Sequence, residues 1–264
     1  MKKRFDVLVI DDEQVILDAI ERICSAEEYR VERVLDANEA LKRIGKKVYR
    51  LILCDLMLPE MNGFQFINIM QGKKIDIPVI MMTGYSTMEN AVKSLNKGAI
   101  DFIPKPFTAD ELCSAIRRGL NYLELRQSDQ NRSSESIVYV PCPPKYFRLG
   151  YVTWISKDYR GSVLIGVTDL FIKTIQMIKK IELMLPQQEI LQGSYCASLI
   201  TVENTVHPLM APISGRIIEC NTELENNHTL LEKDPYFQGW LYRIIPSDYD
   251  YEIKNLVSCS MEMM

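Results

Sequence analysis

Four short apolar runs in the first half of the chain each end in a polar or charged residue. They are residues 7–10 before Asp11 and Asp12, residues 51–54 before Asp55, residues 79–82 before Thr83, and residues 99–103 before Pro104 and Lys105. Near-continuous apolar strands are typical of a parallel sheet that is covered on both faces. Because ligands of such sheets bind beyond the carboxyl ends of the strands, the pattern predicts a functional site at one sheet edge.

Helical periodicity fills the intervals between these runs. The pattern predicts strands at about residues 5–10, 30–35, 50–55, 77–82 and 99–103, with amphipathic helices between them. Thr108 and Glu111 have the spacing of a capping box at the start of the last helix. This alternation predicts an α/β fold with a doubly wound, five-stranded parallel sheet of the flavodoxin-like kind.

The composition changes after residue 126. Residues 127–146 are polar and then proline-containing, and we interpret them as a linker between a first domain, 1–126, and a second domain, 147–264. The second domain has short β-rich runs at 151–155, 162–167, 197–202 and 215–220, one helix starting at Thr168 and another near 248–258. It is expected to be a β-rich barrel-sandwich with peripheral helices.

Charge and hydropathy exclude some partners. Residues 1–125 carry 18 basic and 19 acidic side chains, and the rest carry 13 and 16. Neither half is suited to neutralising a phosphate backbone, so no nucleic-acid partner is expected. No apolar run approaches the roughly 18–20 residues that span a bilayer, and acidic residues interrupt any signal-peptide pattern. The chain is therefore expected to be cytoplasmic, without a membrane partner.

The cysteines and histidines carry no metal-site spacing. The seven cysteines are scattered without a CxxC pair, which favours reduced and mostly buried thiols. Neither His207 nor His228 has a partner at ligand spacing, and both are expected at surface or capping positions.

The polar residues at the strand ends form a coherent chemical set. Asp11, Asp12 and Asp55 would repel one another if they were crowded together, and a divalent cation would relieve that repulsion. Oxygen ligands at a compact site suit Mg²⁺. Lys105 adds a fixed positive charge and Thr83 a hydroxyl group. The set predicts a pocket for a phosphoryl group with a carboxylate as the nucleophile.

These residues stand in the order of a known family. Residues 1–125 resemble the receiver domain of two-component response regulators, through the acidic pair, Asp55, the segment LMLPEMNG at 56–63, Thr83-Gly84 and Lys105-Pro106-Phe107. The resemblance implies that Asp55 is the phosphoacceptor of a sensor histidine kinase and that Mg²⁺ is the cofactor. It further implies a phosphoacceptor that assists its own phosphotransfer and dephosphorylation, without being a separate enzyme.

The resemblance also assigns roles to individual residues. Asp12 would bind Mg²⁺ directly and Asp11 through water, while Asp55 and the backbone carbonyl of Met57 complete the metal shell. Thr83 and Lys105 would bind the phosphoryl oxygens. Phosphorylation adds a charge of about −1.5 to −2, which would draw Thr83 toward the site and move the switch residue Phe102 inward. The face formed by helix 4, strand 5 and helix 5 would then change shape and could form a homodimer.

The second half resembles the H protein of the glycine cleavage system, a lipoyl-carrier fold. The resemblance depends on four segments in order: residues 161–169, Leu185-Pro186, residues 212–215 and the segment DPYFQGWL at 234–241. The family carries lipoic acid on a lysine at a hairpin tip. The corresponding region, 202–212, has no lysine, is about two residues shorter than the family pattern, and lies in a stretch from Ile181 to Glu232 without any lysine.

The missing lysine predicts a degenerate H-protein-like domain that carries no lipoate. His207 in this region is expected to be a structural or merely exposed loop residue. The favoured function is a response regulator whose second domain acts by binding an unknown output protein. Two alternatives are a phosphorylation-controlled lipoyl-type carrier and a transcription factor with an unrecognised DNA-binding surface.

Overall fold

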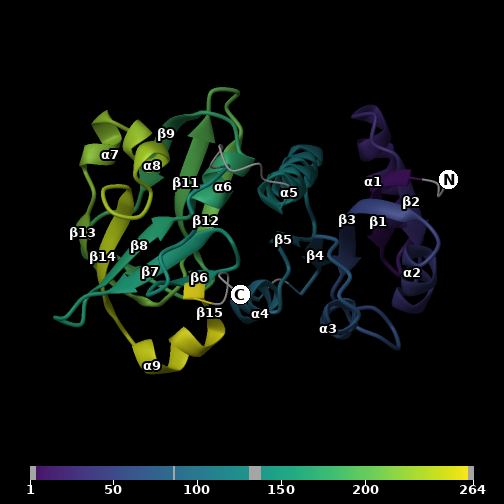
Figure 1. Ribbon diagram of the computed structural model, residues 1–264, viewed down its shortest axis with the longest axis horizontal. Coiled ribbons are helices and arrows are strands. Elements are labelled where there is room, and N and C mark those ends of the chain that lie inside the picture. The colour runs from purple at the N-terminus through teal and green to yellow at the C-terminus, as the bar shows by residue number, and fades with distance from the viewer. Residues whose placement is uncertain (1–3, 86, 131–137, 261–264) are drawn as a thin grey trace. The chain divides into compact units, whose positions relative to one another are not determined.

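The computed structural model describes residues 4–85, 87–130 and 138–260, and the chain divides into two compact units, Met1–Glu124 and Leu125–Met264 (Figure 1). The first unit is a five-stranded parallel sheet in the order β2-β1-β3-β4-β5. Its strands are β1 (Arg4–Ile10), β2 (Val31–Val34), β3 (Val48–Asp55), β4 (Val79–Thr83) and β5 (Asp101–Pro104). This order confirms the predicted doubly wound fold.

Five helices flank this sheet (Figure 1). They are α1 (Gln14–Ala26), α2 (Ala37–Ile44), α3 (Gly63–Gly72), α4 (Met88–Asn96) and α5 (Ala109–Gln130). Their starts follow from local chemistry, because side-chain oxygens of Asp36, Asn62 and Thr87 each accept a hydrogen bond from a backbone N–H of the first turn. The capping box expected before α5 is present, with Thr108 and Glu111 each bonding the other's backbone N–H.

The second unit is built from two antiparallel sheets. A seven-stranded sheet has the order β10-β13-β14-β8-β7-β6-β15, and a three-stranded sheet has the order β12-β11-β9. The strands are β6 (Phe147–Leu149), β7 (Thr153–Lys157), β8 (Val163–Val167), β9 (Ile178–Leu183), β10 (Glu189–Ile190), β11 (Tyr195–Thr201), β12 (Val206–Met210), β13 (Gly215–Cys220), β14 (Trp240–Pro246) and β15 (Val257–Ser258). The predicted β-rich second domain is thereby confirmed.

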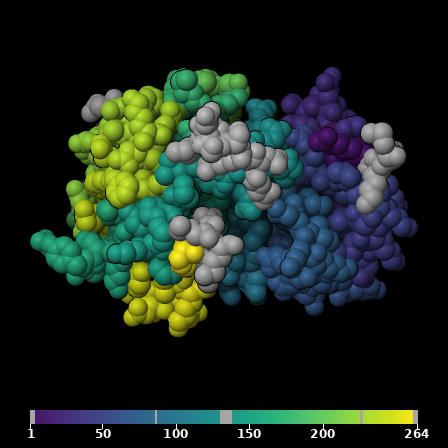
Figure 2. Space-filling view, in the orientation of Figure 1, coloured from purple at the N-terminus to yellow at the C-terminus, as the bar shows by residue number. Residues whose placement is uncertain are grey.

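Short helices lie around these sheets: α6 (Asp169–Thr174), α7 (Glu223–Asn226), α8 (Thr229–Lys233), α9 (Tyr249–Glu252) and the 3₁₀ turn Ile253–Asn255. The helix expected at Thr168 is α6, and the Thr168 hydroxyl caps it by accepting a hydrogen bond from the backbone N–H of Phe171. The turn between β7 and β8 projects from the surface (Figure 2), where Tyr159 is 89% exposed.

Trp154 on β7 is the largest buried side chain of the second unit. It is fully buried, and its indole N–H donates to the carbonyls of Val167 and Pro235, at 3.0 and 3.2 Å. Its ring packs against the backbone of Gly166, where an added Cβ would lie 2.3 Å from the indole. Only glycine therefore fits at that point of β8.

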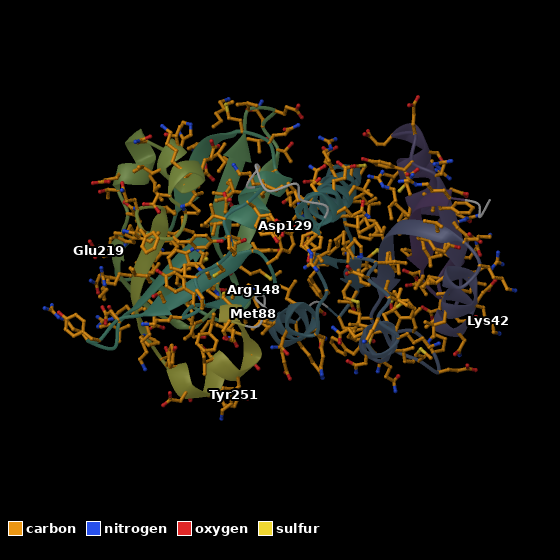
Figure 3. The ribbon with its side chains drawn as sticks, in the orientation of Figure 1. Lys42, Met88, Asp129, Arg148, Glu219 and Tyr251 are labelled. Atoms are coloured by element: carbon orange, nitrogen blue, oxygen red, sulfur yellow. The ribbon has the colours of Figure 1, made fainter. Side chains whose placement is uncertain are left out.

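One predicted element differs from the structure. The helix expected near 248–258 is limited to α9 and the 3₁₀ turn, because the chain then pairs as β15 with the edge strand β6. Tyr251 on α9 is exposed and points away from the sheets (Figure 3).

The segment expected to be a linker, 127–146, belongs to a helix at its start and is hydrogen-bonded to the second unit near its end. Its first residues, as far as Gln130, continue α5. Near its other end, the Val140 N–H donates to the Asp169 carboxylate at 2.7 Å, and the Tyr236 hydroxyl donates to the Val140 carbonyl at 3.0 Å. Residues 131–137 lie outside the described residues. Across the described helices, none combines the length and the apolar character that a membrane span requires.

Candidate functional site

The predicted site residues stand at the carboxyl ends of neighbouring strands. Asp11 directly follows β1, Asp55 ends β3, Thr83 ends β4 and Lys105 directly follows β5. In the sheet register Asp55 is level with Met82, one residue before Thr83. The strand order reverses between β1 and β3, so the two carboxylates flank the switch point where parallel α/β sheets bind their ligands.

Lys105 joins the two carboxylates. Its Nζ lies 2.6 Å from Asp11 Oδ2 and 2.8 Å from Asp55 Oδ1. Asp11 is fully buried, Asp55 is 3% exposed, and the Lys105 side chain is 10% exposed. One ammonium therefore faces two almost fully buried carboxylates, and with both ionised the cluster has a net negative charge.

Backbone N–H groups bind the remaining carboxylate oxygens. The Met57 N–H donates to Asp55 Oδ2 at 2.6 Å, and the Glu13 N–H donates to Asp11 Oδ1 at 3.1 Å. These donors hold both carboxylates in fixed orientations. The sequence predicted Met57 as a carbonyl ligand, and nothing in it indicated these N–H contacts, because every residue except proline carries the same backbone donor.

Gly63 permits the close packing beneath this loop. Its N–H donates to the Leu56 carbonyl at 3.0 Å, and a Cβ at this position would lie 2.8 Å from the Asp55 carbonyl oxygen. The preceding Asn62 begins α3 with a full capping box. The Asn-Gly pair thus fixes the loop that follows Asp55.

Burial and ion pairing act in opposite directions on the charges of this cluster. Burial raises the pKa of Asp11 above its ordinary value, although its bond to Lys105 opposes the rise. Burial alone would lower the pKa of Lys105, but its bonds to Asp11 and Asp55 outweigh that effect and raise the pKa. Lys105 therefore stays protonated, whereas burial disfavours the ionised form of Asp11.

The other predicted residues differ in how far they are buried. Asp12 is exposed beside the buried Asp11. Thr83 is fully buried, and its Oγ accepts a hydrogen bond from the Tyr85 N–H at 3.1 Å. Phe102 on β5 is only 7% exposed, so the inward movement expected of it would begin from a position that is already buried.

The donor set fits Mg²⁺. In the part of the chain that the structure describes, three His, Cys, Asp or Glu side chains do not converge as a preformed metal cluster. Mg²⁺ commonly needs only one or two carboxylates and keeps several waters. The buried carboxylates of Asp11 and Asp55 are hard oxygen donors of this kind, and the exposed Asp12, which follows Asp11 in the chain, and the Met57 carbonyl would add to them.

The second unit has a compact turn in the region where the H-protein family carries its lipoyl lysine. Residues 202–205 connect β11 and β12, and Asn204 has a left-handed φ of 62°. The side-chain carbonyl of Asn204 accepts a hydrogen bond at 3.0 Å from Lys179, which lies on the neighbouring strand β9. This lysine belongs to a strand and not to the turn.

The prediction that His207 lies at the surface is wrong. The residue lies within β12, is 5% exposed, and contacts Phe171 edge-on with ring centroids 6.5 Å apart. The strand alternates outward and inward positions, which places His207 on the inner face together with Leu209. His228 is half-buried just before α8, and its side chain makes no cap hydrogen bond.

Two family models match the chain. Residues 7–117 match the response regulator receiver domain, and residues 146–262 match the glycine cleavage H-protein. Among curated relatives, nitrogen assimilation regulatory protein NtrX of Azorhizobium caulinodans is 35% identical over 124 residues, 46% of this chain and 27% of that protein. Transcriptional regulatory protein DltR of Streptococcus agalactiae is 34% identical over 129 residues, 49% of this chain and 55% of that protein. These matches span between about a quarter and about half of the relatives' length.

Solved structures resemble each half. A CheY-like response regulator receiver domain protein from Methanospirillum hungatei JF-1 has 34% identity and a TM-score of 0.44, covering 48% of this chain and 100% of that one. A glycine cleavage system H protein from Mycobacterium marinum has 26% identity and a TM-score of 0.38, covering 40% of this chain and 87% of that one.

Proposed function

Since the chain joins a response regulator receiver domain to a glycine cleavage H-protein domain, we propose that a histidine kinase phosphorylates it on Asp55. The second domain would then act by contact with another protein. The observation that supports this most is the Lys105 ammonium bound to both Asp11 and Asp55 at the sheet edge. This ammonium can neutralise negative charge on a phosphoryl oxygen, and Mg²⁺ would offset the remaining carboxylate charge.

The chemistry is a displacement at phosphorus. An oxygen of Asp55 bonds to the phosphoryl group while the bond from phosphorus to the kinase histidine breaks, and the released imidazole takes up a proton. Bonds from the Met57 N–H and from Lys105 orient the Asp55 carboxylate. Lys105 neutralises negative charge on the phosphoryl oxygens, and the Thr83 hydroxyl donates to one of them. Asp11, Asp12, Asp55 and the Met57 carbonyl would hold Mg²⁺, which would supply further charge neutralisation.

Phosphorylation would change the conformations of Thr83 and Phe102. The Thr83 Oγ accepts a hydrogen bond from the Tyr85 N–H, which leaves its O–H available to donate to a phosphoryl oxygen as the side chain is drawn toward the site. Phe102 on β5 then repacks in the space beside it. The face that would change consists of α4, β5 and α5, and this face is the proposed homodimer surface.

Replacing Asp55 with asparagine is expected to abolish phosphorylation while the fold survives, because the amide has a similar shape but is not a nucleophile. Intact-mass spectrometry after incubation with a small-molecule phosphodonor and Mg²⁺ should show one added phosphoryl group in the unchanged protein and none in Asp55→Asn. Asp76→Asn, at an exposed loop position, is the matched control and should label normally. Normal labelling of Asp55→Asn would remove Asp55 from this role.

We propose that the second domain carries no lipoate. The supporting observation is the turn 202–205, which contains no lysine, while the neighbouring Lys179 projects from β9 and bonds Asn204. Co-expression with a lipoate ligase should therefore leave the intact mass unchanged, whereas an authentic H protein in the same cells should gain a lipoyl group. Lipoylation of this chain would favour the alternative function, a carrier controlled by phosphorylation. The balanced charge of both halves disfavours the second alternative, DNA binding.

A further inference from the structure

Two buried thiols that are 117 positions apart in sequence meet in the second unit. Cys142 Sγ and Cys259 Sγ lie 2.7 Å apart. The two residues are 6% and 0% exposed, and they belong to one buried cluster with Trp154 and Tyr236. A disulfide bond is about 2.05 Å long. The two sulfur atoms therefore need to move by less than an ångström to bond, and the packed aromatic rings around them keep them in place.

The backbone on each side of the pair is fixed by independent contacts. Before Cys142, both polar backbone groups of Val140 are bound, the N–H by Asp169 and the carbonyl by the Tyr236 hydroxyl. Beside Cys259, strand β15 pairs with β6 (Figure 1), and the Cys259 N–H donates to the Tyr146 carbonyl at 3.0 Å. Backbone hydrogen bonds beside each cysteine therefore hold the two thiols close together.

Burial raises the pKa of two other buried thiols, Cys24 and Cys196, to about 12. At neutral pH such thiols hold their protons, and a protonated thiol is a poor nucleophile. Cys196 belongs to the same unit as the pair and is 1% exposed, which makes it a suitable internal control.

We propose that Cys142 and Cys259 form a reversible disulfide by exchange with a low-molecular-weight disulfide. The Cys142 thiolate attacks one sulfur of that disulfide, which breaks the S–S bond and releases one small thiol. The Cys259 thiolate then attacks the Cys142 sulfur of the mixed disulfide and releases the second small thiol. Two electrons pass from the protein to the small disulfide, and the two protons lost by the cysteines end on the released thiols.

Access to the pair depends on a small opening. Cys142 is the more exposed of the two, which makes it the first to react. Strand β15 has only two residues and lies at the edge of its sheet, so its release breaks few hydrogen bonds. The bond, once formed, ties the segment that precedes β6 to the residue that directly follows β15.

The test uses the full chain. After incubation with oxidised glutathione, the remaining thiols are alkylated under denaturing conditions and the peptides are mapped. Two of the seven cysteines should be lost to alkylation, a peptide joining Cys142 to Cys259 should appear, and dithiothreitol should reverse both changes. Separate glutathione adducts on the two residues, full alkylation of both, or a different pairing would each overturn the proposal.

Variants sharpen this result. Cys142→Ser and Cys259→Ser should each abolish the joined peptide, while Cys196→Ser, which removes another buried thiol of the same unit, should leave it intact. The peptide map of the unchanged protein decides the proposal even if a serine variant fails to fold, because it requires no substitution.

Discussion

Replacing Lys105 with methionine is expected to destabilise the first unit by about 3–5 kcal/mol in magnesium-free buffer, the usual cost of removing one partner of a buried ion pair. The ammonium contacts both Asp11 and Asp55 and is 10% exposed, so its loss leaves two buried carboxylates without a counter-charge. Mg²⁺ should restore much of the loss, about 2.7 kcal/mol at a hundredfold excess over its Kd. Calorimetry with and without Mg²⁺ measures both effects.

The pH dependence of this loss has a defined sign. Burial raises the pKa of Asp11 above its ordinary 3.8, so the unfolded chain ionises first as the pH rises, and ionisation favours unfolding. Without Lys105 this effect grows, and the variant should lose stability relative to the unchanged protein as the pH rises above that ordinary value. Below it the Asp11 carboxyl is protonated in either protein, and the difference should shrink.

Two control substitutions test whether the stability loss of Lys105→Met comes from the lost charge. Asp11→Asn removes one of the two buried negative charges and should raise the melting temperature of the first unit, the opposite of Lys105→Met. Lys42→Met, at an exposed position of α2 (Figure 3), should have little effect on stability. If Lys105→Met were as stable as Lys42→Met, the buried ion cluster would have no part in holding the site together.

Replacing Trp154 with alanine is expected to destabilise the second unit by about 3–5 kcal/mol, the range for removing a large buried ring. The change leaves a cavity among Tyr146 and Tyr236 and removes the donor for the carbonyls of Val167 and Pro235. Both tryptophans of the chain lie in the second unit. Fluorescence of the remaining Trp240 during urea unfolding therefore follows this unit alone, and calorimetry shows whether the first unit is unaffected.

Gly166 provides a matched test of the same contact. Gly166→Ala should be costly in the unchanged protein, because its Cβ would lie 2.3 Å from the Trp154 ring. In the Trp154→Ala background the ring is gone, so the same substitution should be tolerated. Equal costs in the two backgrounds would contradict the packing described here, since contacting residues are expected to be coupled.

Much of the first unit could be predicted because its signals are local. Four of the five strands, β1, β3, β4 and β5, have a site residue at their last position or directly after it, and the capping box of Thr108 and Glu111 formed as its spacing predicted. The parallel sheet then brings the strand ends together without further information. The backbone donors of Met57 and Glu13 could not be predicted, because a peptide N–H has no signature in the sequence.

The second unit was less predictable because tertiary contacts decide its details. His207 reads as a loop residue beside proline, yet the turn closes before it and the strand directs it inward. The pairing of β15 with β6 ends the helix expected near 248–258. The contact between Cys142 and Cys259 spans 117 positions without a CxxC spacing, so only the folded chain reveals it.

That contact has an architectural consequence. Cys142 precedes β6, the first strand of the second unit, and Cys259 directly follows β15, so the two ends of this strand series meet at one spot on that unit. A domain with adjoining ends can be appended to, or inserted in, another polypeptide through a single stalk. The remainder of the surface of such a domain is then left open for contacts with other molecules.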